Sequence, residues 1–392
     1  MLHRRLFVLP LALALLAPAC GPKQPTPPPT KPPEPEKAPV APVPAGFFTL
    51  TPSITVTGVD AAVDFYVKVF AAEKVLGLTG ADGKTIHAEI KIGDSIIMVD
   101  EENVEQGMKS PLTLGGSPAT LMMYVDDVDA VFATAVGAGA KESMPVEEMF
   151  WGDKYGVLID PTGHRWALAT HVEDLTPEQM QQRAEIANQP KPKKAKKKPK
   201  KPTPPAWKAI AGTPATDPTP DEYHTVTVSL TTSDANAAIA YYKAAFGAVD
   251  KSMMPSPDGK VMHAELTIGN SVLMLSDEFP EMGGTSAVTL GGSPVSLVMY
   301  SENVDAAFTA ATGAGGKETM PLTVMFWGDK YGTIVDPAGF TWGLAMRVED
   351  LTPEQMQSNM NAQAPAAAGD PAAADPAAAP ADAAATPPAA TP

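Results

Sequence analysis

Cysteine, histidine and positive charge are all scarce in this sequence. Its 392 residues include one cysteine and six histidines, and its formal net charge is −16. One cysteine provides no disulfide framework, and an acidic chain is poorly suited to nucleic acid as its main partner. No glycine pair is followed by the Lys-Ser or Lys-Thr of a phosphate-binding loop.

The single cysteine, Cys20, ends a segment typical of an export signal. Arg4 and Arg5 precede the apolar run Leu6–Leu16, which is too short to be a stable membrane span. The following Ala17-Pro18-Ala19-Cys20-Gly21 resembles a bacterial lipoprotein cleavage site, with Ala17 where leucine is usual. We expect an exported protein that lipid on Cys20 anchors to the inner or outer membrane. The alternative is an ordinary secretory signal that leaves a free cysteine.

One unit of well over 100 residues occurs twice in the chain. The heptapeptide Phe150–Gly156 returns as Phe326–Gly332, and His87-Ala88-Glu89 returns as His263-Ala264-Glu265. Both pairs are separated by the same offset of 176 residues. A repeat of this length indicates tandem domains, because the repeats of solenoid proteins are far shorter.

Proline-rich stretches separate these two units and predict extended or disordered segments. The lysines of 191–201 favour a soluble spacer over the alternative, a contact with anionic lipid. The predicted organisation is a lipoprotein signal at 1–20, a Pro-rich linker at 21–46, domain 1 at 47–187, a Lys/Pro-rich linker at 188–221, domain 2 at 222–360 and a disordered Ala/Pro tail at 361–392.

Each repeat is predicted to contain two successive modules of one strand, one helix and three further strands. In the first module, Val59–Ala72 has apolar residues at helical spacing, and Gly93-Asp94 is a two-residue hairpin signal. The second half of the repeat follows the same order. The predicted class is therefore α+β, with two βαβββ modules forming a curled mixed sheet in each domain.

Six sequence phrases of repeat one point to one known family. They are Asp64-Phe65-Tyr66, Asp82-Gly83-Lys84, His87-Ala88-Glu89, Ile92-Gly93-Asp94-Ser95, Phe150–Gly156 and Asp160–Trp166. With the doubled modules, they resemble the PhnB-like branch of the vicinal oxygen chelate superfamily, which includes glyoxalase I, bleomycin-resistance proteins and extradiol dioxygenases. The resemblance covers both repeats and none of the linkers. It implies sheets that curl into a cup around a small ligand, with a divalent metal in many members.

The resemblance also implies where metal ligands, His or Glu, would stand: on the first and last strand of each module. None of these positions holds an imidazole or a carboxylate, which borderline divalent metals require. We therefore expect no metal or other cofactor. The positions are Thr51, Met98, Thr120 and Ala167 in repeat one, and Thr227, Met274, Ser296 and Gly343 in repeat two.

His87 and Glu89 are the polar pair that could replace the missing ligands. The Gly93-Asp94 hairpin places Glu89 opposite Met98 and His87 opposite Asp100, and paired residues share a face, so both should point into the cup. They are candidates for metal binding or acid–base catalysis. We favour a histidine hydrogen-bonded to a carboxylate within the sheet. The same alternatives apply to their counterparts in repeat two, His263 and Glu265.

Aromatic and methionine side chains complete the predicted ligand site. They either stack on a flat or apolar ligand or pack the core. The candidates are Met98, Trp151, Tyr155 and Trp166 in repeat one, and Met274, Trp327, Tyr331 and Trp342 in repeat two.

The sequence thus predicts a bacterial envelope lipoprotein whose two glyoxalase-like domains bind a small organic ligand without turning it over. A second hypothesis is a glyoxalase- or dioxygenase-type metalloenzyme that uses a divalent metal with His87, Glu89, His263 and Glu265. A third is a scaffold that binds other envelope proteins through its linkers.

Overall fold

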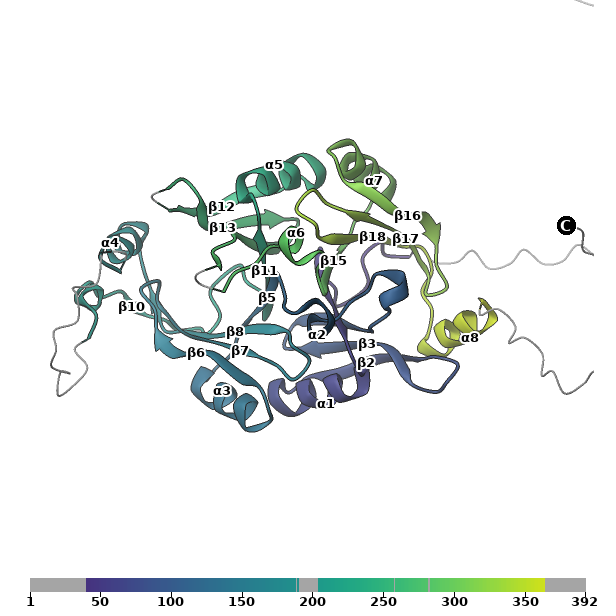
Figure 1. Ribbon diagram of the computed structural model, residues 1–392, viewed down its shortest axis with the longest axis horizontal. Coiled ribbons are helices and arrows are strands. Elements are labelled where there is room, and N and C mark those ends of the chain that lie inside the picture. Colours follow the sequence, from purple (N-terminus) through teal and green to yellow (C-terminus); the bar gives the residue numbers. More distant parts are fainter. Residues whose placement is uncertain (1–39, 188, 190–203, 257, 281–282, 364–392) are drawn as a thin grey trace, which may run out of the picture. The chain divides into compact units, whose positions relative to one another are not determined.

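A computed structural model describes residues 40–187, 189, 204–256, 258–280 and 283–363 (Figure 1). The predicted export signal with Cys20, the lysine-rich stretch 191–201 and the tail from residue 364 lie outside these residues. Among the helices that the structure describes, none has both the length and the apolar character needed to cross a membrane.

Each repeat forms two βαβββ modules, as predicted. The first contains β1 (Leu50–Val56), α1 (Val59–Phe70), β2 (Glu73–Thr79), β3 (Thr85–Ile92) and β4 (Ser95–Glu101). The second contains β5 (Ala119–Tyr124), α3 (Val128–Gly137), β6 (Lys141–Glu148), β7 (Asp153–Ile159) and β8 (Arg165–His171). The third contains β11 (Val226–Thr232), α5 (Ala235–Phe246), β12 (Val249–Pro255), β13 (Val261–Ile268) and β14 (Ser271–Asp277). The fourth contains β15 (Val295–Tyr300), α7 (Val304–Gly313), β16 (Lys317–Val324), β17 (Asp329–Val335) and β18 (Thr341–Arg347).

Short elements connect or follow the modules. In repeat one they are a 3-10 turn η1 (Val104–Gln106), α2 (Pro111–Leu114), β9 (Glu173–Asp174) and α4 (Pro177–Ala187). Between the repeats lie η2 (Ala206–Ala209) and β10 (Thr213–Pro214), and repeat two adds α6 (Ala287–Leu290) and α8 (Pro353–Gln363).

The Gly93-Asp94 turn joins β3 to β4 in the predicted register. Gly93 has φ +57°, a left-handed conformation that glycine adopts without steric cost. His87 lies opposite Asp100, and Glu89 lies opposite Met98. The hairpin prediction is therefore confirmed, and both polar side chains lie on the face that carries Met98.

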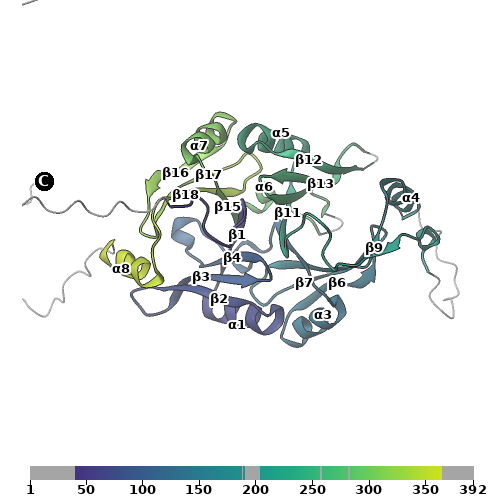
Figure 2. The same cartoon turned by 180° about the vertical axis from the view of Figure 1, so that it is seen from behind.

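Two eight-stranded mixed sheets each combine one module from each repeat. Their strand orders are β16-β17-β18-β15-β1-β4-β3-β2 and β12-β13-β14-β11-β5-β8-β7-β6. The junctions are antiparallel pairs, β1 with β15 and β11 with β5, which place Ser53 opposite Ser296 and Ser229 opposite Thr120. Figure 2 shows β1 of repeat one beside β15 of repeat two. The α+β class is as predicted, but the two modules of a sheet come from different repeats.

The helix-covered faces of the sheets pack into the core. Tyr66 of α1 contacts Trp166 of β8 with 5.5 Å between ring centroids, and Tyr242 of α5 contacts Trp342 of β18 at 5.3 Å. We call the opposite face cup A in the sheet that contains β1 and β15, and cup B in the sheet that contains β5 and β11. Cup A carries a small cluster of Val298, Tyr300, Ala345, Met98 and Tyr331, and cup B a cluster that includes Met122, Tyr124, Ala167, Met274 and Tyr155.

The segment between the repeats is structured from residue 204 onward, which differs from the predicted unfolded linker at 188–221. Trp207 of η2 is buried, and the Arg183 guanidinium of α4 lies 5.3 Å from its ring centroid. Strand β10 pairs with β9. Since a buried tryptophan contributes a large apolar area, this part of the linker packs as an extension of domain 1.

Candidate functional site

Cup A contains a hydrogen-bonded chain of three side chains from three strands. Asp100 accepts a 2.5 Å hydrogen bond from the Ser53 hydroxyl on its Oδ2. Its Oδ1 lies 2.6 Å from Nδ1 of His87. The other imidazole nitrogen, Nε2, lies 4.0 Å from Oε1 of Glu89. His87 is thus held by Asp100 and directs its Nε2 towards Glu89.

Electrostatics make this histidine a cation at neutral pH. Burial lowers the pKa of His87, but the charge of Asp100, the hydrogen bond to Asp100 and the nearby charge of Glu89 outweigh it and raise this pKa to about 10. Burial raises the pKa of Asp100, yet the imidazolium and its hydrogen bonds bring it below the usual value. A protonated imidazole cannot accept a proton, so His87 is a poor general base at pH 7.

Cup B arranges the equivalent pair differently, because Asp100 has Ser276 as its counterpart. Here Nε2 of His263 lies 3.1 Å from Oε1 of Glu265, and the Tyr223 hydroxyl donates to the same oxygen at 2.6 Å. Burial would raise the pKa of Glu265, but these hydrogen bonds and the charges of His263 and Lys251 lower it to about 2. Glu265 is therefore a charged hydrogen-bond acceptor.

The repeated heptapeptide supplies a further buried carboxylate to cup B. Asp153 accepts hydrogen bonds from the Tyr124 hydroxyl at 3.2 Å and Trp151 Nε1 at 3.0 Å. Nδ1 of His171 lies 2.7 Å from its other oxygen. This hydrogen bond raises the pKa of His171 against the effect of burial, and with Asp174 brings it to about 9. Sequence reasoning missed Asp153, although the heptapeptide carries this aspartate in both copies.

The counterpart of this carboxylate in cup A is held less completely. Asp329 accepts a 2.9 Å hydrogen bond from the Tyr300 hydroxyl, but its Oδ1 lies 3.6 Å from Nε of Arg347, too far for a hydrogen bond. Both of these atoms are buried without a hydrogen-bond partner. Burial accordingly raises the pKa of Asp329. The two cups thus differ in polar chemistry despite their common origin.

The predicted aromatic residues separate into two groups. Tyr155 and Tyr331 belong to the cup clusters, with Trp151 edge-on to Tyr155 at 5.6 Å and Trp327 edge-on to Tyr331 at 5.5 Å. Met98 and Met274 also face the cups. The remaining two candidates do not line a cup: Trp166 and Trp342.

These two tryptophans lie on the helix side of the sheets. Side chains alternate along a strand, so Trp166 points away from the face that carries Ala167. The indole nitrogen of Trp166 donates to Asp160 at 2.9 Å, and that of Trp342 donates to Asp336 at 2.8 Å. Both side chains therefore serve core packing rather than ligand contact.

The positions that the family resemblance implies for metal ligands do lie on the cup faces. Register places Ser53 opposite both Met98 and Ser296, and Thr51 and Gly343 opposite Val298. Cup B repeats this arrangement with Thr120, Ala167, Thr227 and Met274.

A divalent metal does not fit these residues. They offer hydroxyls, thioethers or no side-chain donor at all, where such metals require imidazole, carboxylate or thiolate. A Cβ added to Gly343 would lie only 2.3 Å from the Tyr331 hydroxyl. Tyr331 thus takes the space that a ligating side chain at residue 343 would need. Among the described residues, no three His, Cys, Asp or Glu side chains are grouped to hold a metal ion.

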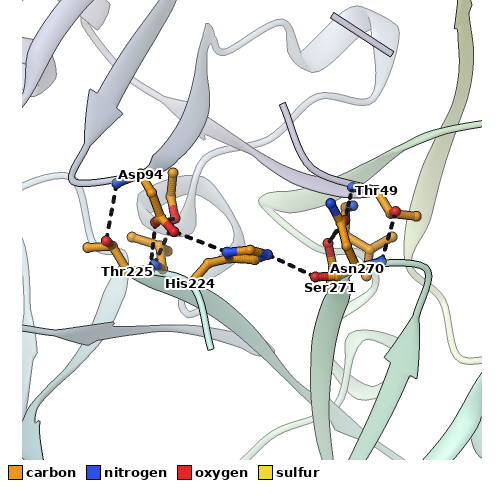
Figure 3. Close-up of polar contacts among 9 residues, drawn as sticks. Thr49, Asp94, His224, Thr225, Asn270 and Ser271 are labelled. Carbon is orange, nitrogen blue, oxygen red and sulfur yellow. Dashed lines mark hydrogen bonds and ion pairs between the residues drawn. The ribbon is translucent and has the colours of Figure 1, made fainter. Parts of the chain in front are cut away.

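Equivalent residues of the two repeats meet between the cups (Figure 3). Asp94 of the β3–β4 turn accepts a 2.8 Å hydrogen bond from the Thr225 amide, and Asn270 accepts one of the same length from the Thr49 amide. His224 connects the two turns, with Nδ1 at 3.1 Å from Asp94 and Nε2 at 2.8 Å from the carbonyl of Asn270. A partly open cavity of about 20 Å³, the room of about one water molecule, adjoins this junction.

Comparison with known proteins gives a family match to both repeats. The model of the Glyoxalase/Bleomycin resistance protein/Dioxygenase superfamily matches residues 48–168 and 224–344. An uncharacterised protein of Mycobacterium bovis is 40% identical over 135 residues, which are 34% of this chain and 89% of the relative. An uncharacterised protein of Arabidopsis thaliana is 28% identical over 128 residues, 31% of this chain and 76% of the relative.

A solved structure of glyoxalase I shows the same fold. A mutant of glyoxalase I from Zea mays superimposes with a TM-score of 0.50 and 15% identity, covering 80% of this chain and 94% of that structure. TioX from Micromonospora sp. is 29% identical with a TM-score of 0.26, covering 31% of this chain and 95% of that structure.

Proposed function

The chain belongs to the Glyoxalase/Bleomycin resistance protein/Dioxygenase superfamily, and from this membership we propose that its two cups bind small organic molecules without metal-dependent turnover. One observation carries the proposal. The cup faces keep aromatic, methionine and hydrogen-bonding side chains, while no position where the family resemblance implies a metal ligand holds an imidazole or a carboxylate. Apolar walls with a few placed polar groups are typical of ligand sites.

The protonation states of His87 and Glu265 support binding over catalysis. His87 is paired with Asp100 and has a pKa of about 10, so it is a donor rather than a base at neutral pH. Glu265 has a pKa of about 2 and accepts hydrogen bonds from Tyr223 and His263. Such groups orient a ligand by hydrogen bonding, whereas catalytic groups need a pKa near the working pH.

Metal uptake and ligand binding together test this proposal. The purified chain is incubated with Zn²⁺, Ni²⁺, Fe²⁺ or Mn²⁺, desalted and analysed for bound metal, and we expect far less than one ion per chain. It is then titrated calorimetrically with bleomycin, catechol and the hemithioacetal of methylglyoxal and glutathione. We expect binding of at least one of these compounds without its consumption. Stoichiometric metal, or turnover of catechol or the hemithioacetal, would contradict the proposal.

The enzyme hypothesis predicts turnover instead, and the same turnover measurements test it. If His87 and His263 act with Glu89 and Glu265 in catalysis, turnover is present in the natural chain and absent when both histidines are replaced by alanine. Asp100 supports an imidazole in cup A only, since Ser276 takes its place in cup B. Activity would then differ between His87→Ala and His263→Ala.

We further propose that the protein works in the bacterial cell envelope, anchored by lipid on Cys20. The arginines, the short apolar run and the cysteine of residues 4–20 support this. Radioactive palmitate should label the natural chain, and the labelled protein should sediment with membranes. Cys20→Ser should abolish both the labelling and the sedimentation. A serine variant that keeps its membrane association would disprove the lipid anchor.

A further inference from the structure

The segments before β1 and β11 lie against the cups. We call residues 42–48 strap A and residues 218–224 strap B; they are equivalent by the 176-residue offset. We propose that the straps are internal, displaceable occupants of the cups, each standing in for an aromatic ligand: an apolar ring in cup A and a hydroxylated ring in cup B. This inference rests on the proposed ligand-binding function and names its ligand class.

Strap A inserts an aromatic ring against the cup A cluster. The carbonyl of Pro42 accepts a 2.9 Å hydrogen bond from the amide of Arg347, the last residue of β18. A turn closed by the Phe47 amide and the Pro44 carbonyl, 3.1 Å apart, then directs Phe47 to Tyr300, with ring centroids 5.4 Å apart. Phe47 thus packs on wall residues of the cup as a ligand ring would.

Strap B repeats this arrangement in cup B. The His171 amide, at the end of β8, donates to the carbonyl of Pro218 at 2.8 Å. The Tyr223 amide donates to the Pro220 carbonyl at 3.3 Å, and the Tyr223 ring lies 5.7 Å from the ring of Tyr124. The same insertion in two cups whose polar groups differ indicates a site for a ring rather than an accident of one linker.

The two inserted rings differ in one group, a hydroxyl, and this difference defines the ligand class of each cup. The Tyr223 hydroxyl donates to Glu265 at 2.6 Å, and the Lys251 ammonium lies 4.0 Å from the ring centroid. Phe47 carries no hydroxyl at the equivalent position. Cup B therefore binds the ring and the hydroxyl of its occupant, whereas cup A binds a ring through apolar and edge contacts.

The strap backbone favours release in cup B. Its turn needs a left-handed residue, which is Gly46 with φ +85° in strap A but Glu222 with φ +71° in strap B. A residue with a side chain is strained in this conformation, because its Cβ crowds the following carbonyl oxygen. Strap B is held by its ring and hydrogen bonds against this strain, so a ligand that replaces the ring contacts also relieves the backbone.

Side-chain mimics provide the test. Toluene has the ring of phenylalanine and p-cresol has the ring and hydroxyl of tyrosine, and both are titrated against the full chain, Phe47→Ala and Tyr223→Ala. We expect the strap variants to bind tenfold or more tightly than the natural chain. Tyr223→Ala should prefer p-cresol to toluene by roughly tenfold or more, because Glu265 regains a donor. Phe47→Ala should show no such preference.

A second measurement separates displacement from simple filling of a hole. In the natural chain, saturating p-cresol should speed hydrogen exchange at the His171 amide several-fold, because strap B releases that amide. The amides inside the β7–β8 ladder should not change. Phe246→Ala removes a ring that packs on Trp342, on the core side of the sheet. This control keeps strap B, so p-cresol should speed exchange at His171 as it does in the natural chain, and filling the new hole should add nothing to that response.

Each contrary outcome has its own meaning. Equal affinity of the natural chain and both variants would overturn the straps as occupants and leave ligand binding by the cups intact. Tighter binding to the variants with no p-cresol effect on His171 exchange in the natural chain would make the straps fixed structure, which also overturns the inference. No binding by any folded form would overturn the aromatic class, and the separate metal and ligand assays would still judge the proposed function.

Discussion

Phe48 and His224, equivalent residues of the two repeats, stack face to face with 3.4 Å between ring centroids and 12° between ring planes. His224 also contacts Asp94 and the carbonyl of Asn270. The stack and the two polar contacts close the junction between the repeats. Its asymmetry, phenylalanine on one side and imidazole on the other, allows the two kinds of interaction to be separated.

Replacing His224 by phenylalanine should keep the stack and lose both polar contacts. We expect the free energy of unfolding to fall by about 1–2 kcal/mol, at roughly 1 kcal/mol for each hydrogen bond. His224→Ala should cost a further 0.5–1.5 kcal/mol or so, the worth of an aromatic pair. Urea denaturation measures both variants. A phenylalanine variant as stable as the natural chain would show that the contacts to Asp94 and Asn270 contribute nothing.

Alkaline pH should destabilise the fold through His87 and His171. Their folded pKa values are about 10 and about 9, above the roughly 6.5 of an unfolded histidine. The stabilisation that protonated His87 and His171 contribute is therefore complete below pH 6.5 and is lost as the pH rises through 9 and 10. We expect at least about 2 kcal/mol less stability at pH 9.5 than at pH 7, since each pKa unit corresponds to about 1.4 kcal/mol.

The double variant His87→Gln and His171→Gln is the control for this pH dependence. Neither glutamine titrates, so the fall between pH 7 and 9.5 should become shallower, whatever the overall stability. An unchanged slope would mean that lysines or tyrosines cause the alkaline loss. His164 works in the opposite direction: burial lowers its pKa, so it should reduce stability as the pH falls below 6.5.

The two strap turns offer a matched pair of backbone substitutions. Gly46→Ala should lower stability by about 1 kcal/mol, because φ is +85° there. The added Cβ would meet no atom within 4 Å, so this cost comes from the backbone conformation alone. Glu222→Gly should raise stability by up to about 1 kcal/mol, because it relieves φ +71°. Glu222 also forms an ion pair with Lys251, with 3.4 Å between Nζ and Oε2, so Glu222→Gln, which keeps the strain and loses this pair, should not stabilise. If it stabilises as much as glycine does, the charge and not the backbone is responsible.

Cutting the chain between the repeats should not separate them. A protease site inserted between residues 190 and 203 would leave the β1–β15 and β5–β11 pairs intact. We expect the two fragments to elute together in gel filtration at the size of the uncut chain and to part only in denaturant. Fragments that separate under native conditions would show that each repeat completes its own sheet.

Local features of the fold followed from the sequence. The Gly93-Asp94 turn chemistry fixed the register of His87 and Glu89, because a two-residue hairpin leaves one pairing. Apolar spacing predicts a helix over Val59–Ala72, and α1 covers Val59–Phe70. The helix ends two residues early because Ala71 takes a left-handed conformation. These are properties of neighbouring residues, which sequence patterns record.

Long-range features did not follow. The sharing of sheets between repeats was invisible, because nothing in two nearly equal copies distinguishes pairing within a repeat from pairing between repeats. Trp166 is a predicted cup residue, but the face of the sheet on which it lies depends on the exact register of β8, which the sequence pattern does not define. Residues 42–46 and 218–221 of the straps fall in the predicted linkers, because the insertion of Phe47 and Tyr223 into the cups depends on tertiary contacts that leave no periodic signal.

The strand exchange across the junction also bears on how such a chain arises. A lone repeat would leave β1 and β5 as unpaired edge strands. Its β1 could pair with β5 of a second copy and its β5 with β1 of that copy, so both sheets would be complete only in a homodimer. Joining two copies in one polypeptide replaces that encounter with an intramolecular one, at a fixed effective concentration. It also frees each half to mutate separately, which the unlike partners of His87 and His263 record.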